Sequence, residues 1–268
     1  DLPPNLSALF VKAIRVLRTR DPSHDQVLTL IDRFTQMCSL FGESSGAFLT
    51  LGRLYVTARD TQSAEKWLEK AAQVEIDRPT ARTFYSNYLL ERHRPEDALN
   101  IINRLMSEGW DDLKKSDSQS AQKVISYLFR ALSDLDRNDE IIRFAQKYLE
   151  IKELAEQAKF STALAILNNC SGLHVTDPEK SLDLLIESGD FLTCESLSNY
   201  KTKLRARVYL SYIKEAKHLL ENINVSKVSK SKVSKIIYNC DQLFSDAFDR
   251  QNAYGVNQFA VPAIEVFR

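Results

Sequence analysis

The chain has few residues that break or reverse the backbone: only 7 glycines and 7 prolines occur among its 268 residues. An all-β sandwich or barrel needs many tight turns, and glycine and proline supply much of the backbone geometry of such turns. Their scarcity argues against these folds and favours helices. The composition, 44% hydrophobic and 27% charged, is that of an ordinary folded protein and argues against global disorder.

The sequence also lacks a long apolar run and an excess of one charge. No stretch of about 18 apolar residues could span a bilayer, and the N-terminal DLPPNLSALF lacks the basic-then-apolar order of a signal peptide. We therefore predict a cytoplasmic protein with no membrane association, although the missing initiator Met also fits a removed leader or a longer parent chain. Lys and Arg together number 36, as do Asp and Glu, so no net charge draws the chain towards nucleic acid or anionic lipid.

Motifs for catalysis and metal binding are missing as well. The sequence contains neither GxGxxG nor GxxxxGK(S/T), the glycine-rich loops that cradle phosphates. Its histidines and cysteines are isolated, without HExxH or CxxC spacing. They are His24, His93, His174, His218, Cys38, Cys170, Cys194 and Cys240. We predict no metal, no cofactor and no enzymatic activity, and we interpret the cysteines as reduced, mostly buried thiols.

What the sequence does contain is helical periodicity. Apolar residues recur at intervals of three and four residues within Leu6–Leu17 and within about Gln26–Leu40, which predicts two amphipathic helices packed antiparallel. Small and large residues then alternate at positions typical of two tightly packed helices. These positions are Leu51, Gly52, Tyr55, Ala64, Leu68 and Ala71. The small Gly52 and Ala64 would let the two helices approach closely.

This pattern repeats further along the chain. The shift that takes Ala64 to Ala98 also takes Leu68 to Ile102, and we call this interval the repeat period. In this spacing the stretch Gly46–Leu105 resembles the tetratricopeptide repeat, whose units are helix hairpins of about 34 residues. The resemblance implies an all-α fold, an α-solenoid of stacked antiparallel helix hairpins, and a function in protein binding.

The repeats predict a division of the chain into two parts. Residues 1–152 are expected to hold the tetratricopeptide-like repeats, including a later hairpin at Ala121–Leu135 and Asp139–Leu149. Residues 153–268 are expected to hold divergent helical repeats or a separate helical domain, because the repeat period does not continue there. Two polar stretches are predicted to be irregular: Ser107–Gln119 and the Ser- and Lys-rich Asn224–Lys235.

The expected binding surface lies on the first helix of each pair, because these helices line the concave side of a solenoid. The resemblance places six residues there: Leu49, Arg53, Val56, Thr83, Asn87 and Leu90. Tetratricopeptide proteins that clamp a C-terminal carboxylate carry Lys and Asn at such positions, and here Asn87 alone matches. The competing interpretation is that Leu49 and Leu90 pack on a neighbouring helix and that Arg53 is merely solvated.

Two groups of basic residues could meet an anionic partner. One is Lys12, Arg15, Arg18 and Arg20, and the other is Lys227, Lys230, Lys232 and Lys235. The first group alternates with apolar residues as any solvated helix face does, and the second lacks aromatic residues that stack on bases. Solvation is the favoured interpretation, with nucleic-acid binding as the alternative.

These observations favour a non-enzymatic scaffold or adaptor, alone or within a larger multidomain protein, that binds a segment of another protein in the groove of the repeats. One alternative is a regulatory or sensor arm that recognises nucleic acid or a ligand and controls an effector domain absent from this chain. Another is an enzyme with a site assembled from scattered residues. Its first candidate residues are Cys194, His174 and Glu195.

Overall fold

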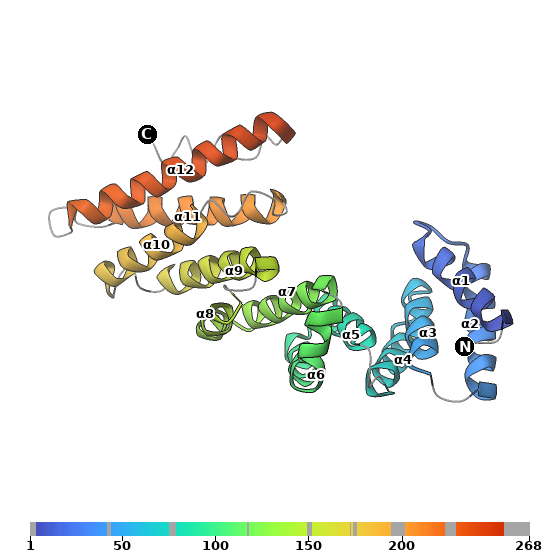
Figure 1. Cartoon of the computed structure of the whole chain (residues 1–268). Coiled ribbons are helices and arrows are strands. Elements are labelled where there is room, and N and C mark those ends of the chain that lie inside the picture. Colours follow the sequence, from blue (N-terminus) through green and yellow to red (C-terminus); the bar gives the residue numbers. More distant parts are fainter. Residues whose placement is uncertain are drawn as a thin grey trace. The chain divides into compact units, whose positions relative to one another are not determined.

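The computed structural model describes residues 4–41, 44–74, 79–116, 118–148, 152–171, 173, 176–193, 202–222 and 229–254. Within these residues all regular secondary structure is helical and no strand occurs, which confirms the predicted all-α class (Figure 1). The chain divides into two compact units, residues 1–131 and 132–268, which are described separately. The predicted boundary at residue 152 concerns the repeat pattern rather than compactness, and it stays a prediction.

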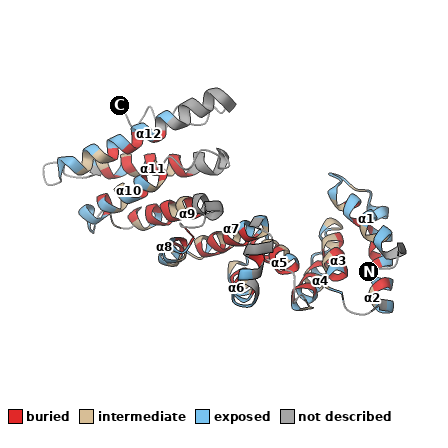
Figure 2. Ribbon diagram, viewed as in Figure 1, coloured by how far each residue is buried: buried red, intermediate tan, exposed pale blue. Residues whose placement is uncertain are grey.

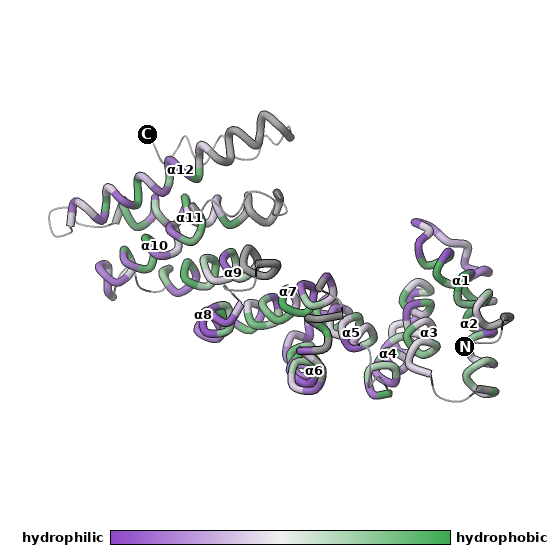
Figure 3. The backbone as a smooth tube through the Cα atoms, in the orientation of Figure 1, coloured by the Kyte–Doolittle hydropathy of each residue, from purple (hydrophilic) through white to green (hydrophobic). Residues whose placement is uncertain are grey.

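The described part of unit 1 consists of helices that pack in sequence order. They are α1 (Pro4–Arg18), α2 (His24–Phe41), α3 (Ser45–Thr57), α4 (Thr61–Val74), α5 (Thr80–Glu91), α6 (Pro95–Ser116) and most of α7 (Ser118–Asp134). From α1 to α6 each helix contacts the next. Buried and exposed residues alternate along the helices (Figure 2), and so do hydrophobic and hydrophilic ones (Figure 3), as expected of amphipathic helices.

The hairpin of α3 and α4 has the close packing that the small residues predict. Gly52 is buried, and Ala64 and Leu68 have no exposed surface. A Cβ atom on Gly52 would lie 2.5 Å from Leu68 Cδ2 and 3.2 Å from the Leu68 backbone nitrogen, closer than ordinary contact distance. Ser44 caps the start of α3, because its side chain accepts a hydrogen bond from the Ala47 N–H.

A buried arginine ties the next hairpin, α5 and α6, to α4. Arg82 is 7% exposed; its Nε donates to the Ala72 carbonyl at 3.1 Å, and its Nη1 lies 2.6 Å from Glu108 Oε2. Ser86, which stands where the repeat period places Gly52, is fully buried and donates to the Arg82 carbonyl at 2.8 Å. The Ser86 hydroxyl is therefore satisfied within α5, and the contacts to the neighbouring helices come from Arg82.

Three of the turns between paired helices share one backbone geometry. Arg59, His93 and Asp136 each have a positive φ, between 54° and 63°, and each follows the first helix of a pair. The N–H of the residue after each one bonds to the carbonyl five residues earlier, which is the Schellman motif. Arg59 and His93 are separated by the repeat period, the same interval as Ala64 and Ala98. Asp136 comes later than this period would place it, because α6 has 22 residues and α4 has 14.

The course of α6 corrects one prediction. The stretch Ser107–Gln119 is helical rather than irregular, since α6 and α7 cover all of it except residue 117, which lies outside the described residues. Leu105 and Leu113 are each 1% exposed, so the apolar side of α6 continues through the polar stretch. Burial of this side outweighs the low helix propensity of Gly109, a cost of about 1 kcal/mol.

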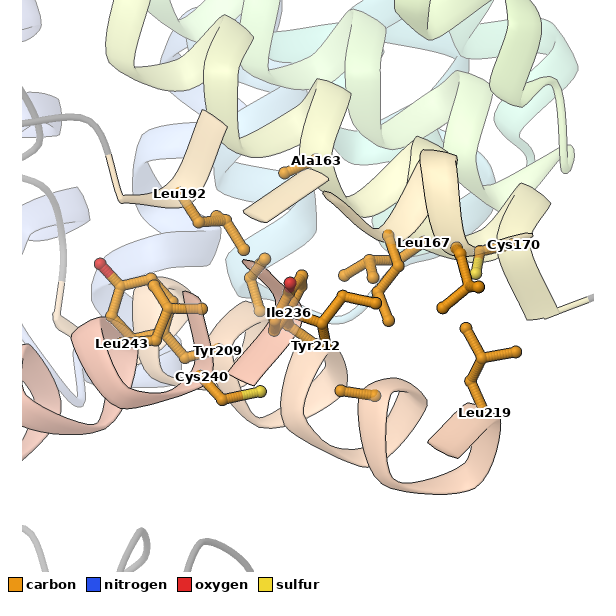
Figure 4. Close-up of a cluster of buried hydrophobic side chains, with 14 of the residues drawn as sticks. Ala163, Leu167, Cys170, Leu192, Tyr209, Tyr212, Leu219, Ile236, Cys240 and Leu243 are labelled. Atoms are coloured by element: carbon orange, nitrogen blue, oxygen red, sulfur yellow. The ribbon is translucent and has the colours of Figure 1, made fainter. Parts of the chain in front are cut away.

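Unit 2 is organised around α10. Beyond the end of α7 its described helices are α8 (Asn138–Gln146), α9 (Lys152–Ser171), α10 (Pro178–Leu192), α11 (Thr202–Asn222) and α12 (Lys230–Tyr254). Asp177 caps α10 by accepting the Lys180 N–H at 3.1 Å. α10 contacts α9, α11 and α12, and their shared apolar core includes Leu167, Tyr212 and Ile236 (Figure 4).

Small residues on α10 allow this packing. Ser188 Oγ donates to the Ala163 carbonyl of α9 at 3.1 Å. A Cβ atom on Gly189 would collide with the Asn239 amide and lie 2.6 Å from the Tyr212 hydroxyl. The Tyr212 hydroxyl and Asn239 Oδ1 are buried and have no hydrogen-bond partner among the described residues. Their burial costs stability within an otherwise apolar core.

Candidate partner-binding face

The first helices of successive hairpins lie side by side in unit 1, since α1 contacts α3 and α3 contacts α5. On α3 the accessible stripe includes Leu49, Arg53 and Val56, at intervals of four and three residues. Val56 is 37% exposed, and Leu49 and Arg53 are partly exposed. Arg53 and Val56 thus lie on one outward side. Leu49 is also partly exposed, but it packs against a core cluster that includes Ala71 of α4 and Ala81 of α5, as the competing interpretation expects.

On α5 the accessible stripe differs from the predicted one. Thr83 and Leu90, which were predicted to face the groove, are buried, with 8% and 0% of their surface exposed. Only Asn87 of the three predicted residues is partly exposed. The accessible residues of α5 are Thr80, Phe84, Asn87 and Glu91. Extrapolation from α3 by the repeat period does not reproduce this stripe, because Thr83 and Leu90 are buried where α5 packs on its neighbouring helices.

Arg53 joins the two stripes. Its guanidinium carbon lies 5.3 Å from the centre of the Phe84 ring, a cation–π contact that sequence reasoning did not identify. Burial, and then the charge of Arg18, lower the pKa of Arg53, which still stays charged at neutral pH. Neither Arg53 nor Asn87 forms a side-chain hydrogen bond or ion pair with another described residue. We name Leu49, Arg53, Val56, Thr80, Phe84 and Asn87 the α3/α5 face.

Charge is divided unevenly between the first and second helices of the pairs. α1 and α3 contain no Asp or Glu, and α5 contains only Glu91, which lies 2.9 Å from Arg130. α2, α4 and α6 all carry acidic residues, such as Glu65 and Glu69 on α4. The first two of these helices, α1 and α3, therefore carry only basic charge, and Arg53 has no ion-pair partner among the described residues.

The chemistry of the α3/α5 face is the main guide to function. No model of a known protein family matches the chain, and no curated protein is similar to it in sequence. The face presents a cation, an amide and apolar carbon side by side, which are groups that bind polypeptide.

The described residues contain no group of three or more His, Cys, Asp or Glu that could hold a metal ion. No described helix is long and apolar enough to cross a membrane.

The predicted basic patch of unit 2 is only partly described. Lys227 lies outside the described residues, whereas Lys230, Lys232 and Lys235 lie in the first two turns of α12. The second half of Asn224–Lys235 is therefore helical rather than irregular. This segment begins a helix that packs on α10 through apolar residues such as Ile236, and its lysines add ion pairs to α10. Local composition does not reveal either contact.

These ion pairs neutralise two of the lysines. Lys232 Nζ lies 2.7 Å from Asp183 and 2.8 Å from Glu179, and Lys235 Nζ lies 2.9 Å from Asp190. Hydrogen bonds to Asp183 and then Glu179 raise the pKa of Lys232. Paired ammonium groups are poorly suited to phosphate, because binding it would break contacts to carboxylates that already exist.

Two of the described cysteines lack the properties of a nucleophile. Cys170 and Cys240 are buried in the core of unit 2 (Figure 4), and burial raises the pKa of both thiols, that of Cys240 to about 12. A catalytic cysteine needs a lowered pKa and access to substrate. The predicted catalytic candidates lie outside the described residues. They are Cys194, His174 and Glu195.

Proposed function

We propose that this chain is a non-enzymatic scaffold or adaptor that binds a segment of another protein on the α3/α5 face of a tetratricopeptide-like solenoid. The observation that carries the proposal is that two polar side chains on that face, Arg53 and Asn87, are partly exposed and have no hydrogen-bond or ion-pair partner among the described residues. Their polar groups are open to water, and a bound polypeptide can replace that water with hydrogen bonds of its own.

The solenoid part of the proposal is supported by the backbone. The Schellman turns at Arg59 and His93 recur at the repeat period, and the first helices contact one another from α1 to α5. In a stack of hairpins, contact between successive first helices is expected on the inner, concave side. The α3/α5 face lies on these first helices.

The test is affinity capture from a lysate with three forms of the full chain: wild type, the double variant Arg53→Glu/Asn87→Ala, and Lys66→Glu. Lys66 is exposed on α4, so its variant reverses a charge on the second helix of the same hairpin. We expect one protein to be retained by wild type and Lys66→Glu and lost by the double variant. If all three forms retain that protein equally, the α3/α5 face is not its binding site.

A regulatory arm that recognises nucleic acid is the second hypothesis. It has less support than the protein-binding hypothesis, because Lys232 and Lys235 are already paired with carboxylates of α10. Arg53, by contrast, has no ion-pair partner among the described residues. Capture of nuclease-sensitive material by all three forms, with an affinity that falls steeply as salt rises, would favour it.

A further inference from the structure

The α3/α5 face carries a positive charge that no described residue balances. Arg53 is partly buried, has no ion-pair partner among the described residues, and is close enough to Arg18 for the two like charges to interact. Partial burial and the neighbouring positive charge both favour the approach of an anion to Arg53. Arg53 is therefore available to an acidic group of a partner.

We propose that the partner segment places an Asp or Glu side chain against Arg53 and an apolar side chain beside it, over Val56 and Leu49. This inference rests on the proposed function and specifies the chemistry of the partner. It concerns an acidic side chain within a segment, which is distinct from the C-terminal carboxylate that a carboxylate clamp holds.

The stacking of Arg53 leaves its hydrogen-bond donors open. The guanidinium carbon lies over the Phe84 ring, 5.3 Å from its centre, and this cation–π contact uses none of the N–H donors. No described residue accepts from these donors either, and a guanidinium can offer two of them to the two oxygens of a carboxylate. Phe84 also restricts the guanidinium, which reduces the entropy lost when the carboxylate binds.

The surrounding helices favour an acidic segment over a basic one. A segment lying along α1 and α3 meets Arg18 and Arg53 but no carboxylate, because these helices contain no Asp or Glu. On α4, the second helix of the hairpin, the acids Glu65 and Glu69 stand beside the bases Lys66 and Lys70, so an acidic segment gains no net attraction there. Attraction on the side of α1 and α3 alone gives selectivity for that side.

Exposed apolar side chains adjoin the cations. Val56 is 37% exposed one turn after Arg53, and Ile14 is 42% exposed one turn before Arg18. A nucleic acid gains little from these side chains, and the Phe84 ring, already covered by Arg53, is poorly placed to stack on a base. A protein segment with adjacent acidic and apolar residues can contact both the cations and the exposed apolar side chains.

A random dodecamer peptide library, displayed on phage, tests the inference on the full chain. Selections on wild type, Arg53→Glu and Lys66→Glu are compared after circular dichroism confirms equal helicity. We expect peptides selected by wild type and Lys66→Glu to be enriched in Asp or Glu next to an apolar residue. The enrichment should disappear for Arg53→Glu. If it persists in Arg53→Glu, Arg53 is not the acidic subsite and the inference is wrong.

Synthetic peptides then measure the contact itself by fluorescence anisotropy. Replacing the selected acid by Gln or Asn should weaken binding to wild type at least tenfold, about 1.4 kcal/mol. The same replacement should change binding to Arg53→Gln less than twofold. An Arg53→Lys chain should bind the acidic peptide with intermediate affinity, because it keeps the charge and loses the two-point contact.

The outcomes separate the inference from the proposed function. If the selected peptides lack an acidic residue but still require Val56 or Asn87, the proposed function is supported and the acidic subsite is wrong. If no selected peptide depends on any residue of the α3/α5 face, the proposed function and the acidic subsite are both wrong. A twelve-nucleotide single strand that competes with the peptides at physiological salt would also overturn the inference in favour of phosphate.

Discussion

Gly52→Ala tests the packing on which the repeat interpretation depends. The new methyl group would lie 2.5 Å from Leu68 Cδ2 and 2.6 Å from Cγ, so either the Leu68 side chain leaves its rotamer or α3 and α4 separate. Overpacking of this kind costs about 1–3 kcal/mol. Alanine offsets it by about 1 kcal/mol through its higher helix propensity. We expect a net loss of about 1 kcal/mol in the free energy of unfolding of unit 1.

Gly46→Ala in the same helix is the matched control. Gly46 is exposed, and a Cβ atom there would meet only Ser44 Oγ at 3.9 Å, so the propensity gain is not opposed. Hydrogen exchange of α3 and α4, read by mass spectrometry together with urea unfolding, reports on unit 1 separately from unit 2. Gly52→Ala should exchange faster than wild type and Gly46→Ala should not. If both variants are stabilised equally, the hairpin is not closely packed at Gly52.

Three further predictions concern a turn, a core and a surface ion pair. His93→Gly should raise the free energy of unfolding by about 0.5–1 kcal/mol, because His93 has a φ of 56° that glycine adopts without strain; lower stability in urea would contradict the turn geometry. Tyr212→Phe should leave the free energy of unfolding unchanged or raise it by up to about 1–2 kcal/mol, since the Tyr212 hydroxyl is buried without a partner among the described residues. Thermal unfolding measures this change, and a clear loss of stability would show that the hydroxyl is hydrogen-bonded. Hydrogen bonds from Arg104 and then Arg82 lower the pKa of Glu108, so its contribution is present above about pH 4.3 and is lost as the pH falls through the lower folded value. The free energy of unfolding of Glu108→Gln should accordingly change less with pH below about pH 4.3 than that of wild type. An unchanged pH dependence would mean that the ion pairs of Glu108 do not contribute to stability.

Local pattern was sufficient to predict the helices and the closest hairpin contact. The period of three and four residues predicted the helical class, and the small Gly52 predicted the approach of α3 to α4. The sequence did not predict that α6 extends through Ser107–Ser116, because Leu113 stabilises that turn by burial that only the fold reveals. Nor did it predict the left-handed turn at His93, where glycine is the usual signal.

The exposure of the candidate binding residues was predicted in part, for a physical reason. Extrapolation from α3 to α5 by the repeat period assumes that both helices turn the same side outward, and this holds for Asn87 but not for Thr83 or Leu90. Phe84 could not be assigned to the site, because its role depends on the contact with Arg53 across two helices. The absence of acidic residues from Pro4–Arg18 and Ser45–Thr57 was a signal in the sequence that could have been used.

The most direct test of the proposed function is a photo-crosslink from the α3/α5 face. A benzoylphenylalanine replaces Val56 in one full-length chain and Lys66 in another, and each is irradiated in a lysate before mass spectrometry. We predict that one protein crosslinks from position 56, at a yield reduced at least tenfold by Arg53→Glu, and does not crosslink from position 66. Crosslinks of that protein from position 66 alone, or nucleic acid attached at position 56, would contradict the proposal that this face binds a protein segment.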